Sequence, residues 1–366
     1  MHRFDAGKSA CRWRRAGRAP KLGGMSEHCT HASFIQHDVP LEHGGRLPAV
    51  TLAYATRGRL APDRRNAILV AHGYTGGPED TIGTAGDPVD GSLAALIGPG
   101  RALDTERYFV ICPNALGSSF GSTNAAETNP ATGRPWGSGF PEITIADIVA
   151  GQRALLAHLG IERLHAVVGV SFGGLQALEW GLSHPAQAGG IVAAMCAPRM
   201  PGVDVAALEA SLAALPGWHD GDYYGQSDLR PAMRQRRLGA LAAFGADAVA
   251  ARSHPEAAER AAHLQRLASA WAERFDPNSL RILFKAMAAY DATDRLAHIA
   301  VPVLYVLCRS DRVVPAALAP GVSAALRQAG VPWQYVEIDS DDGHCAAGSA
   351  ADAWAEQLRG FIDGLG

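Results

Sequence analysis

The sequence lacks long apolar runs, paired cysteines and an excess of charge of either sign. No stretch reaches the ~20 consecutive apolar residues that a membrane-spanning helix requires, so no membrane association is expected. The formal net charge of −3 gives no electrostatic reason to expect nucleic acid as a partner. The 6 cysteines are scattered and form no C-x-x-C pair, so we expect no metal site and a reducing, cytoplasmic location. The glycine-rich segments lack the P-loop and dinucleotide-binding fingerprints, so no nucleotide cofactor is expected.

A secretory signal is not expected, although the sequence opens with a basic segment. Within the first 24 residues, 7 arginine and lysine residues stand against 1 aspartate, and no apolar core accompanies them. We therefore predict that residues 1–34 form a disordered N-terminal extension or reflect an extended gene start. A targeting or anion-binding arm is the alternative.

Short, continuous apolar runs alternate with segments of helical length along most of the chain. Apolar runs of this kind are typical of strands that are buried on both faces of a parallel sheet. They lie at residues 67–71, 108–112, 165–170, 190–194, 303–307 and 335–338, and residues 50–55 alternate like a half-exposed strand. Helices are expected at residues 145–159, 172–183, 322–329 and 350–362. The alternation predicts an α/β protein with a mostly parallel, doubly wound sheet.

One long segment interrupts this alternation with helical patterns alone. Alanine-rich helices are expected at residues 205–215, 233–244 and 255–275, and no convincing strand is found near them. A helical insertion at the carboxyl side of a parallel sheet is typical of a lid over an active site. We therefore predict a lid at residues 199–287, inserted between two core segments at residues 35–198 and 288–366.

The segment 169–173 matches the pattern G-x-S-x-G, which is weak by itself in a glycine-rich protein. Its context makes it specific, because it follows one predicted strand and opens a predicted helix, as a nucleophile elbow requires. Glycine at both ends of the pattern fits a tight turn in which a Cβ atom finds no room. Ser171 is therefore the candidate nucleophile, and the amide of Phe172 is a candidate oxyanion donor at the helix N-terminus. A plain glycine-rich turn is the alternative.

A serine hydroxyl needs a general base and an acid that orients the base. With an elbow of this kind, the partners follow in the order serine, acid, histidine. His344 follows the last predicted strand and Asp311 follows the strand before it, so both stand where active-site loops gather. Asp291 and Asp294 are rival acids, but they leave a helix rather than a strand. We predict the triad Ser171, Asp311 and His344.

A second oxyanion donor is expected in the loop after an earlier strand. The glycine-rich segment 72–77 directly follows the strand at 67–71, so the amide of Tyr74 is the candidate. A plain glycine-rich turn is again the alternative.

Several longer stretches are typical of one protein family. They lie at residues 98–111, 114–117, 121–123, 129–133, 140–147, 176–180, 274–279 and 335–340. From about residue 54 to its C-terminus, the sequence resembles the homoserine O-acetyltransferase family of the α/β-hydrolase superfamily. The resemblance implies the α/β-hydrolase fold and acyl transfer in two half-reactions, with Ser171 acetylated, His344 as the base and Asp311 behind it. It also implies a homodimer with the lid helices at or near the interface.

The acceptor site departs from that family pattern. The resemblance implies that an arginine, a tyrosine seven residues further on and an aspartate after the catalytic histidine hold homoserine. Here the arginine is Arg237, but the other two positions hold Phe244 and Cys345. Losing the carboxylate matters most, because a buried ammonium without a counter-charge costs several kcal/mol. Losing the tyrosine hydroxyl removes a hydrogen bond of about 1 kcal/mol, and Arg237 itself lies in a basic helical run of a kind that is usually solvated.

These departures favour water over an amino acid as the acyl acceptor. We therefore predict a serine carboxylesterase that hydrolyses small, short-chain esters, above all acetyl esters, without a cofactor. The main alternative is an O-acetyltransferase that moves the acetyl group to homoserine or another hydroxyl, with acetyl-CoA as co-substrate only in that case. A non-catalytic binding protein on the same fold is the third hypothesis, although such proteins usually lose a member of the triad.

Overall fold

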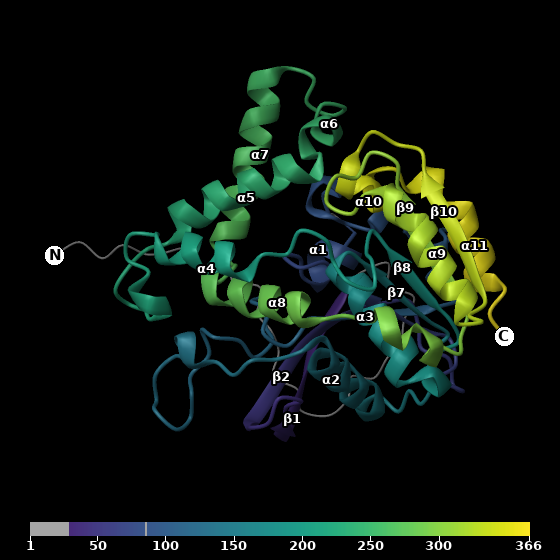
Figure 1. Ribbon diagram of the computed structural model, residues 1–366, viewed down its shortest axis with the longest axis horizontal. Helices are drawn as coiled ribbons and strands as arrows, with labels where there is room; N and C mark the ends of the chain where they lie inside the picture. Colours follow the sequence, from purple (N-terminus) through teal and green to yellow (C-terminus); the bar gives the residue numbers. More distant parts are fainter. Residues whose placement is uncertain (1–28, 85) are drawn as a thin grey trace.

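The computed structural model describes residues 29–84 and 86–366, and an eight-stranded sheet forms its centre (Figure 1). The strands are β1 (Thr30–Pro40), β2 (Arg46–Arg57), β3 (Ala67–Ala71), β6 (Phe109–Pro113), β7 (Ala166–Val170), β8 (Ile191–Ala194), β9 (Val303–Cys308) and β10 (Trp333–Ile338). Their order is β1-β2-β6-β3-β7-β8-β9-β10; the first two pairings are antiparallel and the others are parallel. A separate parallel pair joins β4 (Ile97–Gly98) and β5 (Leu103–Asp104). The predicted α/β class with a mostly parallel sheet is therefore confirmed.

The predicted N-terminal extension at residues 1–34 ends too late, because strand β1 begins at Thr30. Residues 1–28 of that prediction lie outside the described residues. The strand pairs with β2 over its length. Its sequence, THASFIQHDVP, carries little strand signal, because an edge strand is only partly buried and needs no continuous apolar run.

Strand β2 is more buried than its sequence predicts. The alternation in residues 50–55 predicts a half-exposed strand, yet residues 52–57 are all buried. Helices α1 (Pro78–Ile82) and α2 (Ile145–His158) both contact β2, and the strand lies between β1 and β6 in the sheet. Its small apolar side chains therefore pack against neighbours on both faces. The alternation of larger and smaller side chains along the strand did not mean that the smaller ones face water.

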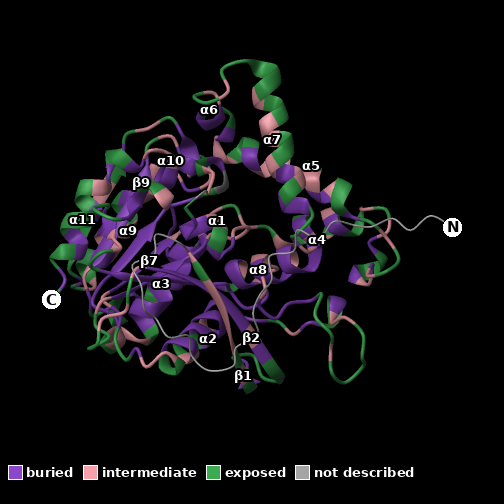
Figure 2. Ribbon diagram, turned by 180° about the vertical axis from the view of Figure 1, so that it is seen from behind, coloured by how far each residue is buried: buried purple, intermediate pink, exposed green. Residues whose placement is uncertain are grey.

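Hydrophobic side chains fill both faces of the sheet and alternate along each strand. In β3, Leu69 belongs to the core on one face, whereas Ile68 and Val70 belong to the core on the other. The covering helices are α2, α3 (Phe172–Ser183) and α9 (Ala319–Gln328) on the first face and α1, α10 (Ala346–Ser349) and α11 (Ala355–Asp363) on the second. Figure 2 shows the central strands and α3 as buried. Burial on both faces explains why these strands read as continuous apolar runs.

The segment between β8 and β9 is helical. It contains α4 (Val205–Ala213), α5 (Arg230–Phe244), α6 (Ala246–Ala250), α7 (Ala257–Ala272) and α8 (Pro277–Ala289). Figure 1 shows α6 and α7 at the top of the molecule, and Figure 2 shows that much of α7 is exposed. Helix α6 is too short to give a periodic signal, and α8 extends beyond residue 287, where the predicted lid ends. We refer to α4–α8 as the lid.

No helix in the described part of the chain combines the length and the apolar character that crossing a bilayer requires.

Candidate active site

Ser171 stands on a strained turn between β7 and α3. Its φ of 56° and ψ of −118° lie outside the regions that residues with a side chain favour. The turn is also crowded, because a Cβ atom on Gly169 would lie 1.9 Å from the carbonyl oxygen of Gly173. A Cβ atom on Gly173 would lie 2.0 Å from the carbonyl oxygen of Ala71. The two glycines therefore let β7, α3 and the end of β3 meet around Ser171.

His344 and Asp311 meet at the carboxyl ends of β9 and β10. Nδ1 of His344 lies 2.7 Å from one carboxylate oxygen of Asp311. The other oxygen accepts hydrogen bonds from the amides of Val313 at 2.8 Å and Val314 at 3.1 Å, so a backbone turn holds the acid in place. Because Nδ1–H donates to the carboxylate, Nε2 is the ring nitrogen that can take up a proton.

The two rival acids lie elsewhere in the structure. Asp291 accepts a hydrogen bond from the Thr293 amide at 2.9 Å and lies 3.9 Å from Arg199. Asp294 is exposed. Of the three candidates, Asp311 is the acid that the structure brings to His344.

The loop after β3 lies beside the elbow, because β3 and β7 are neighbouring parallel strands. Several contacts join this loop to the lid, and two of them are hydrogen bonds to or from α7 and α8. The Tyr74 hydroxyl donates to the Leu280 carbonyl at 2.6 Å, and the Trp271 indole N–H donates to the Thr75 carbonyl at 2.9 Å. The ring of Tyr74 also lies 6.2 Å from that of Phe172, on the other side of the elbow. Helices α7 and α8 thus hold the segment that contains the Tyr74 amide.

His72, the first residue after β3, braces this loop and was missed as a site residue by the sequence analysis. Its Nε2 accepts a hydrogen bond from the Ala115 amide at 2.9 Å, so Nδ1 carries the proton and donates to the Gly73 carbonyl at 2.8 Å. Burial lowers the pKa of His72 from 6.5 to about 4, against the smaller opposing effect of the bond to Gly73. The neutral ring thus links the loop to the end of β6. Its place directly after a buried strand is the one signal that could have indicated it.

A cavity of ≈ 80 Å³ lies between the elbow, the loop after β3 and the lid. The predicted residues in its walls are Ser171, His344, Tyr74, Arg237, Phe244 and Cys345. Asp311 lies behind the histidine, and Phe172 is buried in the core next to the elbow. A larger hollow of ≈ 600 Å³ beside α2 contains none of these residues, so size alone does not locate the site. A serine and a histidine at one cavity, with an acid behind the histidine, can support acyl transfer.

Arg237 is buried, unlike most residues of a basic helical run. Its guanidinium donates to the Thr75 hydroxyl at 2.7 Å and lies over the Trp271 ring, 5.3 Å from the ring centroid. These contacts fix the cation in the wall of the cavity. A guanidinium in such a wall can attract the carboxylate of a small substrate.

Phe244 and Cys345 lie next to the His344 ring. The ring centroids of Phe244 and His344 are 5.3 Å apart. Cys345 is buried in a small apolar cluster with Val89 and residues of α5 and α6, and its thiol lies 3.7 Å from the Val89 carbonyl oxygen. The position for which the resemblance implies a carboxylate therefore packs against several apolar side chains.

One group of potential metal ligands lies outside this cavity. Ligand atoms of Cys29, His31 and Glu79 all fall within 4.8 Å of one another, although Glu79 is distant in sequence. His31 Nε2 lies 2.5 Å from a Glu79 carboxylate oxygen. Two ligands of one zinc ion cannot approach so closely when each lies about 2 Å from the metal at a tetrahedral angle. The contact favours a direct pair of His31 and Glu79.

Known proteins similar to this chain agree in fold and differ in the activity for which they are named. Residues 66–350 match the family model described as alpha/beta hydrolase fold. The chain is 34% identical over 376 residues to a homoserine O-acetyltransferase of Rhodospirillum rubrum, covering 94% of this chain and 95% of that protein. The crystal structure of homoserine O-acetyltransferase from Bacillus anthracis superposes with a TM-score of 0.80 at 24% identity, over 92% of this chain and 98% of that one. An acetylester hydrolase from Corynebacterium glutamicum superposes with a TM-score of 0.76 at 24% identity, over 91% and 96%.

This comparison shows that the prediction of a carboxylesterase is wrong. The relatives that are 34% identical over most of the chain are named for acetyl transfer to homoserine rather than for ester hydrolysis. The likeness to the acetylester hydrolase, at 24% identity, shows the shared fold alone. The prediction failed because water and a hydroxyl compound attack the same acyl-serine, so one altered side chain such as Cys345 cannot identify the acceptor. The alternative, acetyl transfer, is the better supported hypothesis.

Proposed function

Because the chain belongs to the homoserine O-acetyltransferase family of the α/β-hydrolase superfamily, we propose that it transfers an acetyl group from acetyl-CoA to the hydroxyl of homoserine. The observation that carries the proposal is the meeting of Ser171 and His344 at one cavity, with Asp311 2.7 Å from the histidine. This arrangement suits a serine that carries the acyl group between two substrates.

In the first half-reaction, His344 takes the proton of the Ser171 hydroxyl while the serine oxygen attacks the thioester carbonyl of acetyl-CoA. Asp311 keeps the ring in the tautomer with Nδ1–H and stabilises the imidazolium. The amides of Tyr74 and Phe172 donate to the oxyanion of the tetrahedral intermediate. The C–S bond then breaks, the CoA thiolate takes the proton from His344 and leaves as the thiol, and acetyl-Ser171 remains.

In the second half-reaction, His344 takes the proton of the acceptor hydroxyl, whose oxygen attacks acetyl-Ser171. The proton passes to the Ser171 oxygen as the O-acetyl product leaves. We assign Arg237, Phe244 and Cys345 to the acceptor side of the cavity, where the guanidinium suits the carboxylate of homoserine. Cys345 itself supplies no carboxylate for the ammonium at the position where the resemblance implies one, so we expect weaker binding of homoserine than such a carboxylate would give.

Acetyl-CoA acts in this proposal as a co-substrate and not as a resident cofactor. Both substrates are small molecules. The proposal includes a homodimer with the lid at or near the interface, as the family resemblance implies, and a cytoplasmic location. Light scattering of the purified protein tests the dimer, and a monomer at micromolar concentration would contradict it.

The activity is tested by mixing purified protein with acetyl-CoA, with and without homoserine, and by measuring O-acetylhomoserine with mass spectrometry. We expect product that depends on both substrates, parallel lines in double-reciprocal plots and no product from the Ser171→Ala variant. Succinyl-CoA in place of acetyl-CoA tests the acyl group, and we expect the acetyl donor to be preferred because the relatives that are 34% identical are named for acetyl transfer. Release of CoA at the same rate with and without homoserine, with no acetylated product, would contradict the proposal.

A further inference from the structure

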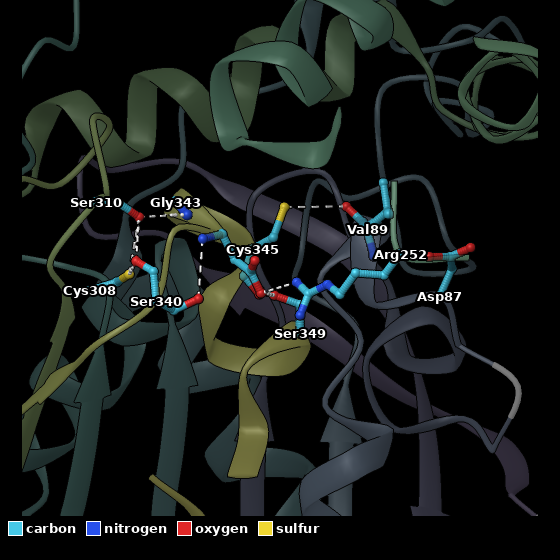
Figure 3. Close-up of polar contacts among 10 residues, drawn as sticks. Asp87, Val89, Arg252, Cys308, Ser310, Ser340, Gly343, Cys345 and Ser349 are labelled. Carbon is cyan, nitrogen blue, oxygen red and sulfur yellow. Dashed lines mark hydrogen bonds and ion pairs between the residues drawn. The ribbon is translucent and has the colours of Figure 1, made fainter. Parts of the chain in front are cut away.

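The loop that carries His344 is joined to the lid by an ion pair (Figure 3). Asp342, two residues before the histidine, is 5% exposed. One of its carboxylate oxygens accepts a hydrogen bond from the Ser349 hydroxyl at 2.6 Å and also pairs with the guanidinium of Arg252. Arg252 lies in the turn that follows α6, so the pair links the lid to the core.

The backbones of the lid and of this loop also meet. Gly245, between α5 and α6, has a φ of 90°, and a Cβ atom there would lie 2.7 Å from the Asp342 carbonyl oxygen. Gly343 has a φ of 60°, and a Cβ atom there would lie 2.8 Å from the Phe244 carbonyl oxygen. Because these glycines allow main chain to touch main chain, a shift of α6 would move the residues directly before His344.

The opposite side of the loop is anchored to the core. The Ser310 hydroxyl donates to the Ser340 carbonyl at 2.7 Å and accepts from the Gly343 amide at 3.0 Å (Figure 3). The Cys308 thiol lies 3.4 Å from the same Ser340 carbonyl. Ser310 directly precedes Asp311, so the acid and the loop share one anchor. The position of the loop is therefore set by the core on one side and by the lid on the other.

We propose that Arg252 and Asp342 are positioning residues that hold His344 in its catalytic place while α6 is docked on the core. Arg252 supplies the opposite charge to the buried Asp342 carboxylate, which without it would keep only the neutral Ser349 hydroxyl of these two partners, so loss of Arg252 should loosen the loop. Docking of α6 thereby completes the site in addition to covering it. Neither residue touches a reacting atom; both act through the loop. The inference rests on the proposed function, because it concerns the base of that reaction.

The test measures acetylation of Ser171 in the full-length protein. p-Nitrophenyl acetate serves as the acyl donor, and the burst of p-nitrophenol gives the maximal acetylation rate and the half-saturation concentration separately. We expect Arg252→Ala to lower the maximal rate about tenfold while the half-saturation concentration changes less than about twofold. Arg252→Lys should recover at least about half of the wild-type rate, because an ammonium can still pair with Asp342. A purely stabilising ion pair would change the melting temperature without this effect on rate.

A matched control is available in the same lid. The Arg230 side chain is 54% exposed, as is that of Arg252, and it pairs with Asp228 and Glu273 away from the His344 loop. Arg230→Ala should leave the acetylation rate within about twofold of the wild type. If Arg252→Ala does not fold, Arg252→Gln repeats the measurement with a side chain of similar length.

Two results would overturn the proposal. One is an acetylation rate of Arg252→Ala within about twofold of the wild type. The other concerns the double variant Arg252→Ala with Asp342→Asn. If its acetylation rate falls by the product of the two single-variant factors, the two residues act independently, whereas partners in one interaction should not be additive. Failure of the proposed function can be distinguished from failure of this inference. Wild-type protein that acetylates Ser171 but forms no O-acetylhomoserine contradicts the proposed function, and the comparison of Arg252 variants still decides the inference. Wild-type protein that does not acetylate Ser171 overturns both.

Discussion

Asp311 uses both oxygens of its carboxylate, one for His344 at 2.7 Å and one for two backbone amides. Asparagine has the same shape but lacks the charge that stabilises the imidazolium and selects the tautomer. We therefore expect Asp311→Asn to lower turnover ~10³–10⁴-fold. The exposed rival gives the control, and Asp294→Asn should stay within about twofold of the wild type. Steady-state formation of O-acetylhomoserine by the two variants checks this, and the reverse order would reassign the acid.

Ser171 holds backbone strain that can be measured without a substrate. Its φ of 56° and ψ of −118° cost about 1–3 kcal/mol for a residue that carries a Cβ atom. Glycine at position 171 relieves the strain, but it also raises the conformational entropy of the unfolded chain, which lowers the stability by about 0.4–1 kcal/mol. We expect the free energy of unfolding of Ser171→Gly to exceed that of Ser171→Ala by about 1 kcal/mol, because alanine keeps the Cβ atom. Urea denaturation compares the inactive pair, and equal stabilities would show that the turn is relaxed.

His72 should make the stability of the protein depend on pH. Its pKa is about 4 in the folded protein and 6.5 in the unfolded chain, so acid protonates the unfolded chain first. The stabilisation is complete above pH 6.5 and is lost as the pH falls from 6.5 towards 4, by up to about 3 kcal/mol. His72→Gln keeps an acceptor and a donor but does not titrate. We expect the stability difference between wild type and variant to shift by that amount between pH 7 and pH 4, in urea titrations. A constant difference would contradict the role of His72.

Among the elements, those buried on both faces were the most predictable. The expected ranges 67–71 and 172–183 coincide with β3 and α3, because a buried strand and a helix that an elbow opens leave strong local patterns. Strand β1 and helix α6 left no such pattern, since one is a mixed edge strand and the other has five residues. Elements that leave a pattern in the local sequence could therefore be predicted. Elements that are stabilised mainly by pairing with another strand or by docking on the core could not.

The same limit applies to the site. The chemistry of the elbow and the order of serine, acid and histidine indicated Ser171, Asp311 and His344, because each follows a strand that can be recognised locally. The contacts that join the lid to the core span long distances in sequence. Arg252 and Asp342 are 90 residues apart, and Tyr74 and Leu280 are 206 apart. No spacing rule connects such pairs, so the lid could be predicted but not its effect on the loops beneath it.

Helix α7 acts on the loop after β3 through one indole N–H. Trp271 donates to the Thr75 carbonyl at 2.9 Å, and phenylalanine would lose this bond while keeping a smaller aromatic ring beside the Arg237 guanidinium. We expect Trp271→Phe to lower kcat about three- to tenfold, because the Tyr74 amide in that loop is then held less firmly. Trp180→Phe is the matched control. The buried indole of Trp180 in α3 donates to the Gln152 side chain of α2 at 2.8 Å, so this variant also loses one indole hydrogen bond but not one to the loop after β3. Equal losses of kcat in the two variants would show that the effect is one of stability.

Burial differs greatly between the parts of the molecule, and local stability should follow it. All of β3 is buried between two helical layers, whereas most residues of α7 are exposed or partly exposed. A strand enclosed in this way exchanges its amide hydrogens only when the whole core opens, but a helix at the surface can open alone. Helix α7 is therefore expected to be less stable than the sheet, which suits an element that docks and releases, whereas most of α8 is buried.

Hydrogen exchange followed by mass spectrometry tests this division in the whole protein. We expect exchange in β3 and β7 to be slow and to accelerate with small additions of urea, because urea promotes global unfolding. Exchange in α6 and α7 should be faster and nearly independent of urea, and the Arg252→Ala variant should speed it further in α6 while leaving β3 unchanged. If α6 and α7 were as protected as β3, the lid would open only together with the core. In that case the ion pair of Arg252 and Asp342 could still hold His344, but it could not couple the position of the histidine to a separate movement of the lid.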